Sequence, residues 1–141
     1  MGAPQPHRGP LQRHRLLRGV GTARGLAKLY SALVSPVDRH QPLLSADTAS
    51  AFAQIQSNGF DLVLRSQKAW AVGFHTYSEI YPSLAAGSFG HSGAGGQQAL
   101  VDPRNALSYS FLRRRFLFPA QADPDHNRLL RALRSAADAR R

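Results

Sequence analysis

The chain contains 141 residues, which is enough for one compact domain and short for two. Hydrophobic residues make up 43%, and 18 Lys and Arg against 8 Asp and Glu give a formal charge of +10. No stretch approaches the roughly 20 consecutive apolar residues of a transmembrane helix. The sequence has no cysteine, which excludes disulfides, thiolate nucleophiles and Cys-based zinc sites.

The positive charge is concentrated at the two ends of the chain. Residues 1–37 hold six bases and no acids, residues 38–101 hold three bases and four acids, and residues 102–141 hold nine bases and four acids. Residues 1–18 are rich in Pro, Arg and His and lack hydrophobic periodicity, which predicts a disordered basic arm before a folded portion over 19–141. The start lacks the apolar segment of a secretory signal, so we expect a cytoplasmic location.

Two helices are predicted at the start of the folded portion. The first begins after Thr22, ends before Pro36 and has apolar residues at the spacing of one buried helical face. Those residues are Leu26, Leu29, Tyr30 and Leu33. Ser45 is a suitable N-cap for a second helix, which ends at Asn58-Gly59. Its apolar face comprises Ala49, Phe52 and Ala53.

After residue 68 the hydrophobic period becomes that of a strand. Over residues 70–77, every second residue belongs to one strand face, and most residues of that face are large and apolar. This alternation predicts one strand with a heavily apolar face. That face comprises Trp70, Val72, Phe74 and Thr76. Further on, Gln97–Val101 and 106–112 flank Asp102-Pro103-Arg104-Asn105. This predicts an antiparallel hairpin with a type I turn, in which Asn105 tolerates a left-handed backbone.

A helix is predicted to close the chain. Asp123 is a suitable N-cap, Pro124 fits the first helical position, and Asp125 complements the helix dipole. Its predicted apolar stripe comprises Leu129, Leu130, Leu133, Ala136 and Ala137. The order of helices, strands and helix favours an α+β fold in which helices flank an antiparallel sheet.

Several segments together resemble a known family. They are Thr22-Ala23-Arg24-Gly25-Leu26-Ala27-Lys28-Leu29-Tyr30, Phe89-Gly90-His91-Ser92-Gly93-Ala94-Gly95-Gly96 and the Asp102-Pro103 turn. In order and spacing they are similar to the C-terminal part of the serine β-lactamase-related hydrolases, which include class C-like β-lactamases, esterases and penicillin-binding-protein relatives. The resemblance covers residues 20–137. It implies an incomplete β-lactamase/transpeptidase-like fold.

The resemblance implies a role for each residue of the third active-site motif of that family. His91 would supply a donor or partial positive charge, and the Ser92 hydroxyl would bind a substrate carboxylate or carbonyl. Gly93 would let the substrate lie close to the strand, and the Ala94 N–H would be half of an oxyanion hole. A histidine at the first motif position favours a small-molecule ester or amide as substrate. We expect no cofactor and no metal for this chain.

Two other motifs of the family are missing. No serine has a lysine three residues on, because Ser66-Gln67-Lys68 has the wrong spacing, and Tyr-x-Asn has no match. The resemblance therefore implies a hydrolase fragment that keeps only the third motif and is inactive alone. We expect it to need a missing N-terminal half or to self-associate, and whether the chain is an enzyme stays open.

Three other interpretations remain. Gly90-His91-Ser92-Gly93-Ala94 is one glycine short of a nucleophile elbow, whose partners would have to be the adjacent Asp125 and His126. Alternatively, the glycines serve only to let one strand pass close to its neighbour.

The histidines lack metal-site spacing, so no metal site is predicted. Finally, Arg113-Arg114-Arg115 and the basic arm allow a nucleic-acid-binding or interaction module without catalysis, although no nucleic-acid motif is present.

Overall fold

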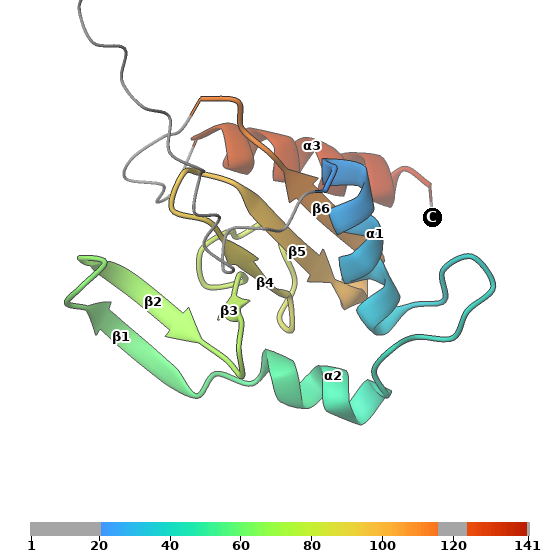
Figure 1. Ribbon diagram of the computed structural model, residues 1–141, viewed down its shortest axis with the longest axis horizontal. Coiled ribbons are helices and arrows are strands. Elements are labelled where there is room, and N and C mark those ends of the chain that lie inside the picture. The colour runs from blue at the N-terminus through green and yellow to red at the C-terminus, as the bar shows by residue number, and fades with distance from the viewer. Residues whose placement is uncertain (1–20, 116–123, 141) are drawn as a thin grey trace, which may run out of the picture.

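The computed structural model describes residues 21–115 and 124–140. Its helices are α1 (Ala23–Val34), α2 (Ala46–Ala53) and α3 (Pro124–Asp138), and its strands are β1 (Ser57–Asp61), β2 (Ser66–Trp70), β3 (His75–Thr76), β4 (Phe89–Ser92), β5 (Gln98–Asp102) and β6 (Leu107–Phe111). Each strand pairs antiparallel with the next (Figure 1). The predicted α+β fold with an antiparallel sheet is therefore confirmed, while the predicted arm over 1–18 and the cap Asp123 lie outside the described residues.

Helices α1 and α2 begin where their caps predict. The Thr22 side chain accepts a hydrogen bond from the Gly25 N–H at 3.0 Å, and the Ser45 side chain accepts one from the Thr48 N–H at 3.2 Å. The predicted end of the second helix at Asn58-Gly59 is wrong, because α2 stops at Ala53 and these two residues pair with β2. That ladder satisfies the backbone groups that a longer helix would otherwise have used.

The single strand predicted over 70–77 is wrong as well. The chain turns back within it, so that Trp70 in β2 pairs with His75 in β3. The Ala71 N–H donates to the Phe74 carbonyl at 2.8 Å across this turn, and Gly73 takes a φ of +75° inside it. A left-handed residue makes such a tight reversal possible, and glycine adopts that conformation without steric cost.

The hairpin of β5 and β6 is confirmed, with one correction at its turn. Asp102 caps a short 3₁₀ helix over Pro103–Asn105, and the left-handed residue is Ala106 (φ +49°) rather than Asn105. The Asn105 side chain instead donates to the Asp102 carboxylate at 2.6 Å. Because the same carboxylate oxygen, Oδ2, also accepts the Ala85 N–H at 2.8 Å, the turn also anchors the segment before β4.

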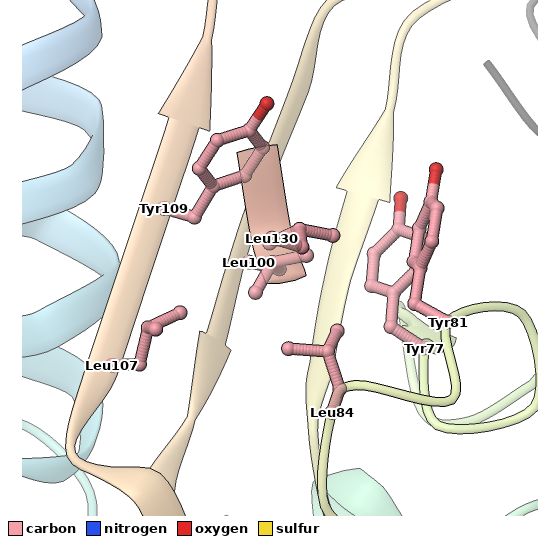
Figure 2. Packing of buried hydrophobic residues seen from close by; sticks show 7 residues of the cluster. All are labelled: Tyr77, Tyr81, Leu84, Leu100, Leu107, Tyr109 and Leu130. Carbon is pink, nitrogen blue, oxygen red and sulfur yellow. The ribbon is translucent and has the colours of Figure 1, made fainter. Parts of the chain in front are cut away.

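Two apolar clusters form the core, one on each face of the sheet. The first joins Leu130 of α3 to β5, β6 and the turn after β3; its members are Tyr77, Tyr81, Leu84, Leu100, Leu107, Tyr109 and Leu130 (Figure 2). The second joins Tyr30 of α1 to Phe89, Ala99 and Val101. Since residues of one strand alternate between faces, Leu100 and its neighbours Ala99 and Val101 serve different clusters. Helices α1 and α3 thus cover opposite faces.

Both long helices are less buried than their patterns predict. Tyr30 is buried in α1 as predicted, whereas Leu29 is 53% exposed. In α3, Leu130 is fully buried, but Leu129 and Leu133 are 40% and 39% exposed and Ala136 is exposed too. The spacing identifies an apolar face correctly, but only part of each face meets the sheet.

Gly90 of β4 lies at the closest approach inside the sheet. A Cβ at this position would collide with the carbonyl oxygen of Ala99 and lie 2.6 Å from the Cα of Leu100. Any side chain would therefore push β4 and β5 apart. This glycine sets the position of the strand that carries His91 and Ser92.

Candidate functional site

The motif residues lie at the end of β4, where one side of the strand is unpaired. On the β5 side, His91 and Ser92 pair with Ala99 and Gln98. On the other side β3 is only two residues long, and its last partner on β4 is Gly90. Within the described residues, no strand flanks the His91–Ser92 half of β4 on that side. An unpaired strand edge of this kind is where extended ligands add as a further strand in other proteins.

A closed turn follows β4 and contains the Ala94 N–H. The Gly93 N–H donates to the Gln97 carbonyl at 2.8 Å, and the Gly96 N–H donates back to the Gly93 carbonyl at 3.0 Å. Gly96 has a φ of +87°, which favours glycine. The Ala94 N–H forms no hydrogen bond with any other described residue. It is therefore available to an oxygen outside the turn, as a donor for a developing oxyanion must be.

His91 is exposed, and one of its nitrogens is already used. Nδ1 lies 2.8 Å from the carbonyl oxygen of Ser92. Because a carbonyl oxygen only accepts, Nδ1 carries the proton. In the neutral ring Nε2 is then an acceptor, so His91 donates to a ligand only when it is doubly protonated.

Two aromatic rings support the His91 ring. It meets His75 edge-on with ring centroids 4.9 Å apart, and its centroid lies 6.1 Å from that of Trp70. His75 is 2% exposed and packs on Trp70 at 3.9 Å. Burial above all, helped by the positive charges of His91 and Lys68 and opposed by Asp61, lowers the pKa of His75 to about 4. His75 is consequently neutral at pH 7.

His126 braces the motif turn from α3. It is buried, its Nε2 donates to the Gly96 carbonyl at 3.2 Å, and its Nδ1 accepts from the Tyr109 hydroxyl at 2.8 Å. Both His126 nitrogens thus bind groups other than Ser92. The nucleophile-elbow interpretation, which needs His126 or Asp125 beside Ser92, finds no support in this geometry. Sequence reasoning missed this bracing role, because Gly96 lies 30 residues away from His126.

A cavity of about 220 Å³ lies beside Ser92. The residues that line it come from β2, the turn after β3, the ends of β4 and β5 and the start of α3. They are Ser66, Gln67, Lys68, Tyr77, Ile80, Tyr81, Ser92, Gly96, Gln97, Gln98 and His126. The lining contains no Asp or Glu. The sequence gives no local signal for this cavity, because its walls come from five separate segments.

Three buried polar atoms on these walls have no hydrogen-bond partner: Ser66 Oγ, the Tyr77 hydroxyl and Gln98 Nε2. Burial raises the pKa of Tyr77 well above its ordinary value, and the side chains of Ser92 and Gln98 lie close enough to oppose that shift. By distance and angle, neither neighbour completes a hydrogen bond with the Tyr77 hydroxyl. Figure 2 shows the hydroxyls of Tyr77 and Tyr81 pointing the same way, away from Leu84.

The basic run at 113–115, metal-binding side chains and membrane-spanning helices were the other features to consider. The Arg113 guanidinium lies 3.2 Å from the Asp125 carboxylate and 5.2 Å from the Phe111 ring, so part of the basic run serves to fasten α3 to β6. Over 21–115 and 124–140, no group of three or more metal-binding side chains comes together. Among the helices in the described ranges, none has the length and apolar character to cross a membrane.

Comparison with known proteins finds similarity among solved structures only. No family model matches the sequence, and no curated protein matches it. The chain superposes on EstA from Arthrobacter nitroguajacolicus Rue61a with a TM-score of 0.74 and 22% identity, over 84% of this chain and 32% of that one. It superposes on a penicillin-binding protein homolog from Caulobacter crescentus with a TM-score of 0.72 and 30% identity, over 82% of this chain and 32% of that one.

These neighbours confirm the predicted fold. The chain has a β-lactamase/penicillin-binding-protein-like hydrolase fold, and it spans about a third of the length of each neighbour. The match supports the resemblance to the serine β-lactamase-related hydrolases at the level of the superfamily. It does not favour the nucleic-acid-binding alternative.

Proposed function

We propose that this chain provides the third-motif wall of an esterase- or amidase-like serine hydrolase, the part that corresponds to the C-terminal region of such enzymes. The observation that carries the proposal is the unpartnered Ala94 N–H, presented at the unpaired end of β4 within this fold. His91 and Ser92 stand next to it on the same strand.

Each motif residue has a definite task in the proposed reaction. The Ala94 N–H donates to the oxygen that becomes negative when an ester or amide carbonyl is attacked. The Ser92 hydroxyl binds a polar group of the substrate that lies along β4. His91 Nε2 accepts a proton when the ring is neutral, and it stabilises negative charge when the ring is protonated.

The chain alone is not expected to turn over a substrate. It contains no Ser-x-x-Lys, and loss of the nucleophile from a cooperative catalytic set costs on the order of 10⁶ in rate. The nucleophile would therefore come from outside these 141 residues, in a longer form of the chain or in a partner chain. A fluorophosphonate or fluorescent penicillin should leave the intact mass of the purified chain unchanged, and stoichiometric labelling would refute this, with Ser92→Ala as the first variant to make.

A graft tests whether the motif residues support the reaction when the rest of the enzyme is present. Residues 21–140 replace the matching third of the Caulobacter protein, and labelling by fluorescent penicillin is compared between host and graft. We expect the graft to be labelled, and Ser92→Ala and His91→Ala to slow labelling by about tenfold or more. His40→Ala, at an exposed histidine outside the motif, is the matched control. A folded graft that stays unlabelled while the host reacts would contradict the proposal.

A further inference from the structure

Strand β1 is an edge strand with one side of its backbone unused. It pairs with β2 over all five of its residues, and among the described residues no other strand pairs with it. Figure 1 shows β1 at the outer end of the sheet, beyond β2. An edge of this kind presents a row of backbone N–H and C=O groups to any strand that can pair with it.

The edge lacks the features by which proteins usually block such pairing, which are proline, lysine, a bulge or a covering element. Its sequence is Ser-Asn-Gly-Phe-Asp, and its register with β2 is unbroken. Ser57, Asn58 and Phe60 are exposed. The one charged residue of β1 is Asp61 at its last position, where Oδ1 accepts hydrogen bonds from two N–H groups of the following turn.

A second copy of the chain fits this edge in one full register. When a two-fold axis perpendicular to the sheet relates two copies, β1 meets β1 antiparallel, and residues directly opposite each other lie on the same face. The register that uses all five residues of β1 places Gly59 opposite Gly59 of the second copy. Around this centre, Asn58 lies opposite Phe60 and Ser57 lies opposite Asp61. No two like charges are then directly opposed.

This register brings together two charged groups that have no ion-pair partner within one copy. Lys68 of β2 pairs with Gly59, so its side chain lies on the same face as that of Asp61. None of the ion pairs between described residues involves Lys68 or Asp61. Two strand spacings of about 4.8 Å separate Lys68 laterally from Asp61 of the second copy. Gly59 has no side chain to stand between them, so the two side chains can meet.

The same register covers apolar side chains that are exposed in one copy. Phe60 is 62% exposed, and the two Phe60 residues lie diagonally across the new strand pair. Diagonal neighbours are about 7–8 Å apart, which is within reach of aromatic rings. Continued beyond the strand, the register directs Val63 at the hairpin tip toward Ile55 of the second copy. These residues are 88% and 44% exposed, so both gain cover.

We propose that two copies of this chain associate through their β1 edges, antiparallel about Gly59, and join their sheets into one. The inference goes beyond the proposed function and shares no residue with the motif on β4. It is tested on the purified chain without any turnover. Its failure therefore leaves the labelling experiments untouched, and their failure leaves this interface untouched.

Sedimentation equilibrium of the purified chain measures the dimer directly. We expect a monomer–dimer equilibrium in the micromolar range with no larger species, because the edge is short and an isologous pairing closes at two copies. Phe60→Lys places a charge on the edge and should raise the dissociation constant about tenfold or more. Leu112→Lys changes an exposed leucine that follows β6, at the other end of the sheet, and should leave the constant unchanged.

The ion pair across the interface is tested in the same way. Lys68→Met should raise the dissociation constant about threefold, as expected for an exposed ion pair. It should have no such effect in a chain that already carries Asp61→Asn, which keeps the oxygen that caps the turn and removes the charge.

Disulfide cross-linking tests the register, since the natural chain has no cysteine. A Cβ at Gly59 meets nothing within 4 Å, so Gly59→Cys should fold and place its thiol opposite its own copy. Mild oxidation should give a covalent dimer. Ser57→Cys is the matched control, because the two Ser57 residues lie about 13 Å apart along the strands. A disulfide requires Cα atoms within about 7 Å.

Circular dichroism confirms that each variant is folded before it is compared. A chain that stays monomeric at every concentration would overturn the proposal, and so would open-ended oligomers. Equal effects of Phe60→Lys and Leu112→Lys would overturn it as well. An unchanged dimer in Lys68→Met, or equally fast cross-linking of Gly59→Cys and Ser57→Cys, would show that the copies do not meet in this register and would overturn it too.

Discussion

The β4–β6 half of the sheet and the β1–β2 hairpin belong to one continuous ladder but differ in what covers them. Phe89 and Leu100 in the first region are 0% exposed, whereas Phe60 and Leu62 in the hairpin are 62% and 85% exposed. Helices α1 and α3 pack on β5 and β6. Figure 1 shows the hairpin extending to the left of the view, away from these helices.

This difference separates backbone pairing from apolar burial as sources of stability. The hairpin keeps a full five-pair register between β1 and β2, but it joins β3 through the single pair of Trp70 with His75. A two-stranded ribbon with an exposed apolar tip gains little from the hydrophobic effect. We therefore expect substitutions in the two regions to differ sharply in their effect on the free energy of unfolding. The motif strand β4 belongs to the region in which that effect is larger.

The largest contrast is expected for leucine truncation. Leu100→Ala removes a fully buried side chain from the cluster in Figure 2 and should lower the free energy of unfolding by about 4 kcal/mol. Leu62→Ala, in the hairpin, should change it by less than about 0.5 kcal/mol. Urea unfolding followed by circular dichroism measures both. Similar losses for the two variants would mean that something covers the hairpin in solution.

Glycine substitution sharpens the same contrast at the backbone. Gly90→Ala forces a methyl group against the main chain of β5 and should cost about 3 kcal/mol. Gly59→Ala in β1 meets nothing within 4 Å and should be neutral within about 0.5 kcal/mol. Urea unfolding followed by circular dichroism measures both variants. A well-tolerated Gly90→Ala would show that β4 can move away from β5, and the position of the motif would then not be rigid.

His75, at the junction of the two regions, should make stability depend on pH. Its pKa is about 4 in the folded chain and about 6.5 when unfolded, so the unfolded chain binds more protons between these values. Stability should therefore fall as pH drops, by about 2 kcal/mol between pH 7 and pH 5. His75→Phe should flatten this slope, whereas His40→Gln, at an exposed histidine, should keep it. An unchanged slope in His75→Phe would place the titration elsewhere.

Local chemistry explains which elements could be predicted from the sequence. The β5–β6 hairpin follows from Asp102-Pro103, because the cap and the fixed proline φ act within four residues. The reversal inside 70–77 was missed, because alternation of side chains looks the same on either side of a tight turn at Gly73. Leu29 was expected to be buried, but periodicity identifies an apolar face and says nothing about whether another element covers it.

The candidate site also has a part that could be predicted from the sequence and a part that could not. The positions of His91, Ser92 and Ala94 on one strand and its turn follow from a continuous stretch of sequence. The brace from His126 to Gly96 and the cavity walls from β2 and β5 depend on residues that only the folded sheet brings together. Three-dimensional information was therefore needed for the part of the site that is built from separate segments.

The smallest effect on stability should come from the hairpin tip, where association is the informative readout. Phe60, Leu62 and Val63 are 62%, 85% and 88% exposed, and an apolar tip of this kind favours contact with another surface. Replacing Leu62 and Val63 with Ser should leave unfolding unchanged within about 0.5 kcal/mol and reduce self-association in light scattering. Phe89→Ser serves as the opposite control, because it should unfold the chain and increase association. A wild-type chain that is monodisperse and monomeric would contradict the expectation, and it would show that the uncovered hairpin is tolerated in water without a partner.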